Sequence, residues 1–153
     1  MTITVLLLIH GLMAMLLVGA ITHQLIAAWR GAPKPGARFF NRLANVSTTT
    51  YTNAVIILYL CVVIGGGIIY PTYVIDVKAS LTDAQMLSAI GAFEMKEHAA
   101  VFGLALLPTY RYFWSVDTSP AHALARKLNT TVVAAVVWWS LGVGHILNNI
   151  KGL

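Results

Sequence analysis

Apolar residues run in long blocks along this chain, and polar residues gather between the blocks. Three blocks contain no Asp, Glu, Lys or Arg: residues 1–29, 43–75 and 128–150. Each is longer than the ~20 apolar residues that an α-helix needs to cross a bilayer. The pattern predicts membrane spans over 3–29, 51–70 and 128–148. We expect the first block to be a retained helix and not a signal peptide, because no positive segment precedes it.

A fourth helix is predicted where the pattern is interrupted. Residues 84–93 and 99–110 are apolar, but Glu-Met-Lys-Glu-His separates them at 94–98. The run Thr-Asp-Ala-Gln at 82–85 fits a capping box, so we expect one helix over 84–114, kinked at Pro108. Ser119 is a suitable N-cap and Pro120 a suitable first residue for the last helix, which we place at 120–148.

Charged residues between the blocks indicate how the helices cross the membrane. Residues 30–42 hold four basic side chains and no acidic one, whereas residues 76–97 hold four acidic side chains and two lysines. Cytoplasmic loops are the ones rich in Lys and Arg. The sequence therefore predicts an all-α integral membrane protein, a single antiparallel four-helix bundle over 1–153 with both termini on the outer side. Trp29 and Trp114 should then lie together at the cytoplasmic interface.

Composition narrows the class of protein. Of 153 residues, 58% are hydrophobic and 10% are charged, whereas soluble domains carry about 25% charged residues. A soluble enzyme and a disordered chain are excluded, and the single cysteine excludes a disulfide scaffold. The net charge of +5 is spread over loops, so we expect the lipid bilayer and no nucleic acid as a partner. We expect a multi-pass protein of the cell inner membrane.

Histidines within the predicted spans suggest a ligand site, because ionisable residues in a membrane are costly. His10, His98 and His145 come from three helices and fall at one depth in the outer half. Imidazoles that face each other across a helical bundle hold b-type haem. His10 and His98 lie on helices that are diagonal in a square bundle, so we predict them as the axial pair. His145 is then a neighbour of the haem or the alternative ligand.

The other polar candidates leave several roles open. His23 lies near the inner end of the first helix, as an interfacial polar residue or as a ligand of a second haem. Glu94 precedes His98 by one helical turn, and with Glu97 it is a candidate second-shell partner or proton relay. The alternative for each histidine is a buried imidazole that hydrogen-bonds between helices. For both glutamates the alternative is a solvated helix start.

The four helices and the histidines His10, His23, His98 and His145 resemble the small four-helix b-type cytochromes. Two such families are the superoxide oxidases of the cytochrome b561 group and the HemJ-type protoporphyrinogen oxidases. The segment 8–13, Leu-Ile-His-Gly-Leu-Met, is loosely similar to the first-helix histidine region of HemJ-type proteins, without the tryptophan-and-glycine run that follows it there. The resemblance is architectural and implies only that these histidines are haem ligands.

Three interpretations of function therefore stand side by side. The first is a haem b protein, with one or two haems, that transfers electrons between a quinone and an outer acceptor as a membrane oxidoreductase. The second is a copper- or zinc-binding membrane protein with His10, His98, His145 and Glu94 as ligands, because imidazole suits both metals. The third is a non-catalytic subunit of a larger respiratory or photosynthetic membrane complex, in which the histidines are structural.

Overall fold

The computed structural model describes residues 2–30, 48–116 and 119–150. Four long helices contain most of them: α1 (Thr2–Arg30), α3 (Thr48–Thr72), α5 (Leu87–Arg111) and α6 (Ala123–Ile150). Within these ranges there is no β-strand, so the prediction of an all-α chain is confirmed. The basic segment expected to face the cytoplasm lies, except for Arg30, outside the described residues.

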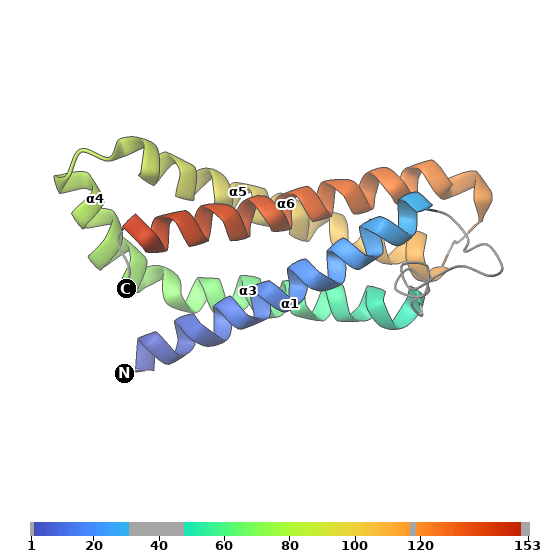
Figure 1. Cartoon of the computed structure of the whole chain (residues 1–153), viewed down its shortest axis with the longest axis horizontal. Coiled ribbons are helices and arrows are strands. Elements are labelled where there is room, and N and C mark those ends of the chain that lie inside the picture. Colours follow the sequence, from blue (N-terminus) through green and yellow to red (C-terminus); the bar gives the residue numbers. More distant parts are fainter. Residues whose placement is uncertain (1, 31–47, 117–118, 151–153) are drawn as a thin grey trace.

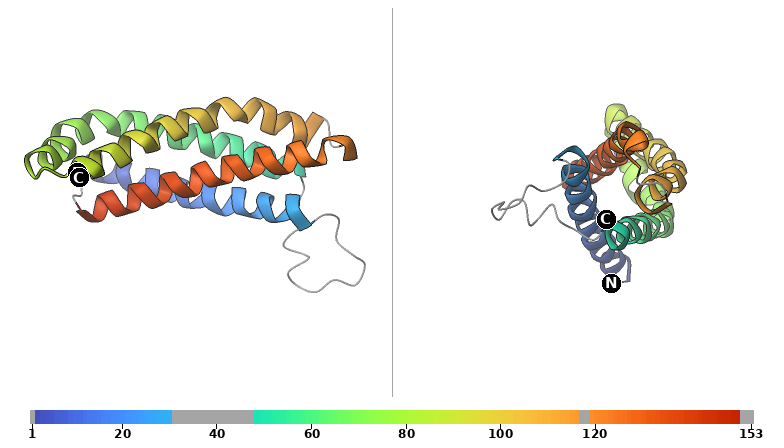
Figure 2. Two further views of the ribbon diagram at one scale, coloured as in Figure 1. Left: turned by 90° about the horizontal axis from the view of Figure 1, so that it is seen from above. Right: turned by 90° about the vertical axis from the view of Figure 1, so that its right-hand side faces the viewer.

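Successive long helices run in opposite directions, and the first turn of α1 lies at the same end as the last turn of α6 (Figure 1). Around the bundle, α1 packs against α3 and α6, while α5 packs against α6 and α3. Helices α1 and α5 therefore face each other across a diagonal, as the end-on view in Figure 2 illustrates. Square packing of this kind leaves an axial space that side chains from all four helices can line.

Three helical stretches are long and apolar enough to cross a membrane: Ile3–Arg30, Tyr51–Asp83 and Pro120–Ile150. Their length and composition agree with three of the predicted spans. The remaining long helix, α5, is interrupted by the charged residues at 94–98, which lower its mean hydropathy. That α5 forms a fourth span stays a prediction.

The second helical stretch extends beyond the predicted end at residue 70. Helix α3 reaches Thr72, continues as a π-helical segment (η1, Tyr73–Lys78), and ends with the short α4 (Ala79–Asp83). Pro71 lies inside this run and has no N–H to donate to the preceding turn. Because Tyr73 and Val77 are buried, the extension packs on α5 and is part of the folded core.

The run at 82–85 ends a helix, so the predicted capping box is wrong. The Thr82 hydroxyl donates to the carbonyl of Lys78 at 2.8 Å and caps no helix start. Gln85 has a positive φ of 57°; its N–H donates to Thr82 O at 3.0 Å, and the N–H of Met86 donates to Leu81 O at 2.8 Å. This pattern is a Schellman motif, which terminates α4. Helix α5 begins only at Leu87.

The other end of α5 leads into the start of the last helix. Helix α5 continues through Pro108 to Arg111, and a π-helical segment (η2, Tyr112–Val116) follows it. A short 3-10 turn (η3, Pro120–His122) precedes α6, with Ser119 at its N-cap position and Pro120 as its first residue. The predicted start of the last helix is therefore confirmed.

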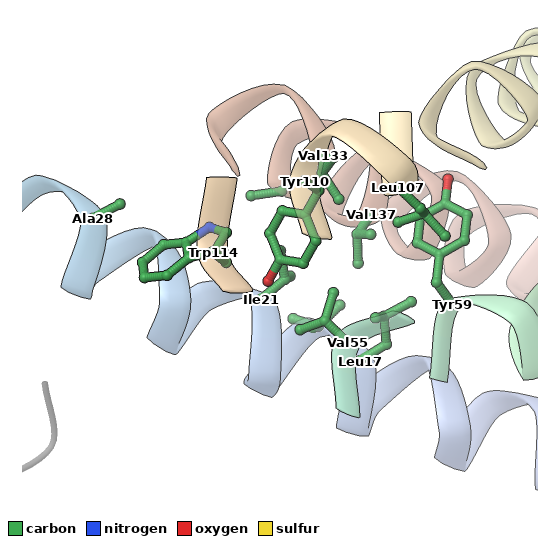
Figure 3. Close-up of a cluster of buried hydrophobic side chains, with 12 residues drawn as sticks. Leu17, Ile21, Ala28, Val55, Tyr59, Leu107, Tyr110, Trp114, Val133 and Val137 are labelled. Carbon is green, nitrogen blue, oxygen red and sulfur yellow. The ribbon is translucent and has the colours of Figure 1, made fainter. Parts of the chain in front are cut away.

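The main hydrophobic core fills the half of the bundle that contains the end of α1 and the start of α6. Figure 3 shows Trp114, Tyr110 and Tyr59 in a row within this core, with Ile21 and Val55 packed beside them. At its cavity-facing edge, α3 and α5 approach closely because Gly103 has no side chain and the Tyr59 ring lies on it. The Tyr59 hydroxyl donates to the carbonyl of Ala100 at 2.8 Å.

Tryptophan–threonine hydrogen bonds lie at the end of this core that contains Trp114. The indole N–H of Trp29 donates to Thr131 Oγ1 at 3.0 Å, and that of Trp114 donates to the neighbouring Thr130 Oγ1 at 2.8 Å. Both tryptophans are therefore held on one turn of α6 and lie together at one end of the bundle. That this end is the cytoplasmic interface stays a prediction. Closer to the bundle centre, buried Gln24 donates to Thr52 Oγ1 at 3.0 Å. Such bonds satisfy polar groups that lipid could not.

Candidate cofactor site

A cavity of about 550 Å³ lies between the long helices, in the half of the bundle that contains His10. Small-molecule and cofactor sites usually have volumes of about 300–1,000 Å³. Its walls come from α1, α3, η1, α5 and α6 and are mainly apolar. The main core closes one end through Leu17, Tyr59 and Val137, which belong both to the core and to the lining. At the other end Tyr73 and Val77 belong to a second core cluster with Leu81 and Ile90.

His10 of α1 lines this cavity and packs on α3 through two glycines. A Cβ atom at Gly65 would lie 3.3 Å from His10 Nδ1, and one at Gly66 would lie 3.4 Å from Cε1. Nδ1 is buried and has no hydrogen-bond partner among the described residues. The absence of side chains at these glycines lets the imidazole lie flat against α3. Because Nδ1 is buried against α3, Nε2 is the ring nitrogen that remains for the cavity.

His145 of α6 lines the same cavity, beside Gly144. Its side chain is exposed, and its Nε2 lies 3.3 Å from the amide nitrogen of Asn149, which also donates to the His145 carbonyl at 2.8 Å. A ligand that binds Nε2 would replace the 3.3 Å contact with Asn149. The structure therefore brings two of the three predicted outer histidines to one space.

His98 and Glu94 do not line the cavity. His98 is exposed on α5, and its Nδ1 contacts the backbone carbonyl of Glu94 at 2.7 Å. The Glu94 carboxylate instead forms an ion pair with Lys78 Nζ at 2.8 Å. This pair joins η1 to α5 and gives the Glu94 carboxylate a bracing contact. A role of Glu94 as a partner of the His98 imidazole stays a prediction. Haem ligation by His98 stays a prediction from the sequence.

Two charged residues line the cavity, Lys96 and Glu97 of α5. They form an ion pair at 3.0 Å, in which the Lys96 side chain is 17% exposed and the Glu97 side chain 44%. The Lys96 ammonium also lies 4.1 Å from the centre of the Phe93 ring. Phe93 in turn stacks on Tyr73, with ring centres 3.6 Å apart. The cavity thus has a charged, aromatic edge on α5 and an apolar interior.

The remaining candidates lie elsewhere. The His23 ring packs near the Tyr51 ring toward the opposite end of the bundle, with 6.1 Å between ring centres. The His122 ring lies near the Phe113 ring at the start of α6, with 5.7 Å between ring centres. Trp138, whose indole N–H donates to Thr22 Oγ1 at 3.0 Å, and Trp139 are half-exposed and are not part of the cavity wall. Over the described ranges, no group of three or more His, Cys, Asp or Glu side chains is placed to hold a metal ion.

The cavity also reaches the lipid-facing surface. Its lining includes Leu8, Leu12 and Met15 of α1 and Val101 of α5, all of them largely exposed on the outside of the bundle. Apolar side chains of this kind face lipid in a membrane. An apolar ligand can therefore reach the cavity from the bilayer side.

The residues fit a flat, largely apolar cofactor held by imidazole. The interpretation of His10 as an interhelical hydrogen-bond donor predicts a partner for Nδ1, and the described residues provide none. Glycines lie behind its ring, a second imidazole lines the same space, and a cation stands at the edge. Sequence reasoning identified the histidines. It missed Tyr73, because the predicted helix ended three residues earlier.

Comparison with known proteins returns no matching family model, no similar curated protein and no similar solved structure.

Proposed function

We propose that this chain is a haem b-binding integral membrane protein that transfers electrons, with His10 and His145 as the axial ligands. The observation that carries the proposal is that these two histidines, from α1 and α6, line one cavity of about 550 Å³. Histidine imidazole is a common ligand of haem iron, and two imidazoles on opposite sides of the iron give a low-spin haem b. We pair His10 with His145 and not with His98, because His145 lines the cavity whereas His98 does not.

Each part of the cavity has a role in holding such a group. His10 presents Nε2, while Gly65 and Gly66 hold its ring against α3. His145 would hold the group from α6 through Nε2, which lies 3.3 Å from the Asn149 amide nitrogen in the structure. Apolar side chains such as Leu17 and Val137 cover the macrocycle and exclude water. When bound, haem b supplies one-electron redox chemistry, whose potential depends on its ligands and on burial.

The membrane setting completes the proposal. The bundle spans the cell inner membrane with both termini outside and α5 as the fourth span. The cavity then lies in the outer half, where an electron can pass between a membrane quinone and an acceptor on the outer side. The opposite end of the bundle bears the basic residues Arg30, Arg111, Arg126 and Lys127, as expected of a cytoplasmic end.

The test is the absorption spectrum of the purified full-length protein. We expect a low-spin b-type spectrum, with haem that acid–acetone extracts because no thioether link holds it. His10→Ala and His145→Ala should each lose most of the haem. His23→Ala and His122→Ala are matched controls, which change an imidazole outside the cavity and should retain it. A colourless protein from haem-replete cells would overturn the proposal.

A haem-containing protein whose His145→Ala variant keeps its spectrum while His98→Ala loses it would restore the diagonal pair and reject ours. The comparison has to be made on the haem-to-protein ratio of folded material. Size-exclusion profiles and helical circular dichroism of each variant provide that control.

A further inference from the structure

We propose that Lys96 binds a carboxylate of the cavity's ligand, so that the site selects a flat apolar molecule with an acidic edge. The inference rests on the proposed function, in which the ligand is haem b and the carboxylates are its propionates. Lys96 is the only basic residue, other than histidine, in the cavity lining described above. Its side chain is mostly buried, at 17% exposed, and a buried ammonium requires an anionic partner.

The partner that Lys96 has in the structure is a weak one. Glu97 is its neighbour in sequence, and side chains at successive helix positions point in different directions. The Glu97 carboxylate is also the more exposed member of the pair, at 44%. Solvent around the half-exposed Glu97 carboxylate screens its attraction to the ammonium. A carboxylate that enters the cavity can therefore replace Glu97 with little loss.

Aromatic stacking fixes the position of the ammonium. Lys96 Nζ lies 4.1 Å from the centre of the Phe93 ring, within the range of a cation–π contact. The Phe93 ring is held by Tyr73, at 3.6 Å between ring centres and 12° between planes. Tyr73 belongs to η1, the π-helical extension of α3. The extension beyond Pro71 thus holds the cation at the cavity edge.

The experiment compares two haems that differ in their propionates, which are free carboxylates in one and uncharged methyl esters in the other. Full-length apoprotein in detergent is titrated with haem b and with its dimethyl ester, and binding is followed by absorbance. Lys96→Met should weaken haem b by about tenfold, because one charge-assisted hydrogen bond is lost, and leave the affinity for the dimethyl ester nearly unchanged. Lys96→Arg should keep the affinity for haem b. Lys127→Met, which removes a lysine beside Trp29 at the other end of the bundle, should change neither.

The outcomes separate the two proposals. If Lys96→Met binds both porphyrins as the parent protein does, the carboxylate site is wrong, and the haem proposal stands. If Lys96→Met weakens both porphyrins equally, the residue has a structural role and the carboxylate site is again wrong. If the parent protein binds neither porphyrin, the proposed function itself fails.

Discussion

At the residue scale, the position of the His10 ring depends on the absence of side chains beside it on α3. Gly65 and Gly66 leave room on α3 for its ring, and no hydrogen bond of Nδ1 fixes it within the described structure. A ring held by shape is sensitive to any atom added behind it, because protein interiors are close-packed. The same glycine run supplies its own control, since a Cβ at Gly67 would meet nothing within 4 Å.

We therefore predict opposite effects of one substitution at two neighbouring glycines. Gly65→Leu should displace the His10 imidazole and abolish haem binding. Gly67→Leu should retain haem and raise stability by up to about 1 kcal/mol, because leucine favours the helix more than glycine does. Haem content and thermal unfolding in detergent measure both. Equal haem content in the two variants would show that the contact between His10 and α3 does not position the ligand.

The histidines show how far single residues can be interpreted from sequence. Depth along each helix follows from residue number, so the common layer of His10 and His145 was predictable. Rotation about the helix axis was not, because α5 has no sharp apolar face near His98. The charged residues Glu94, Lys96 and Glu97 surround it in sequence, and only packing decides that Lys96 and Glu97 line the cavity whereas His98 does not.

At the scale of elements, the closest approach of α3 and α5 depends on Gly103. A Cβ there would overlap the Tyr59 hydroxyl and lie 3.0 Å from Val136 Cγ1. We predict that Gly103→Ala lowers stability by about 1–3 kcal/mol, the usual cost of overpacking. Gly91→Ala on the same helix is the matched control, since its Cβ would meet nothing within 4 Å. Reversible unfolding in mixed detergent measures the free energies.

Tyr59→Phe tests the cause of that loss. Removing the hydroxyl costs its hydrogen bond to Ala100, about 1 kcal/mol, but it also removes the atom that the new methyl group would strike. The double variant Tyr59→Phe/Gly103→Ala should then be more stable than the sum of the single changes predicts. Strict additivity would show that the methyl group is accommodated without contact with Tyr59.

The turn between α4 and α5 gives a second prediction for an element. Gln85 occupies the left-handed position of the Schellman motif, with φ 57°, a conformation that costs most side chains about 1–2 kcal/mol. Gln85→Gly should stabilise the protein by up to about 1 kcal/mol, and Gln85→Ile should destabilise it by a similar amount. Gln85→Gly also removes the exposed bond from Gln85 Nε2 to Thr82 O at 3.2 Å, so the gain is smaller than the full cost of the left-handed conformation. In a capping box, glycine at this position would remove a reciprocal bond with no conformational gain. Thermal unfolding of the two variants distinguishes the motifs.

This turn also shows why element boundaries were harder to predict than the elements. Thr-Asp-Ala-Gln at 82–85 fits a helix start by composition, yet the Thr82 hydroxyl donates backwards to Lys78. The same four residues end a helix here, because the preceding residues stay helical through Pro71. Tertiary packing of Tyr73, Val77 and Leu81 on α5 favours that continuation. Such packing between distant parts of the chain cannot be predicted from the residues around the turn alone.

At the scale of the whole molecule, the described acidic residues lie toward the α4 end and the basic pair Arg126 and Lys127 toward the other. Lys127 Nζ lies 5.4 Å from the Trp29 ring and Arg126 lies 5.7 Å from the Trp114 ring. Cations beside interfacial tryptophans are typical of a cytoplasmic membrane boundary. We predict, in a Cys61→Ala background, that Thr82→Cys reacts with a membrane-impermeant maleimide from outside whole cells. Ala121→Cys should react only after permeabilisation. The reverse pattern would invert the topology.

The opening of the cavity beside Leu8, Leu12 and Val101 has a consequence for how the site is filled. A sparingly water-soluble ligand partitions into lipid, so the concentration that governs occupancy is its mole fraction in the bilayer and not its concentration in water. Loading should then slow when empty vesicles are added at constant total ligand, because they dilute the ligand within the membrane. On the proposed function, we therefore expect the bilayer to be the reservoir that supplies the protein, and membrane area to set, together with affinity, how much of it is loaded.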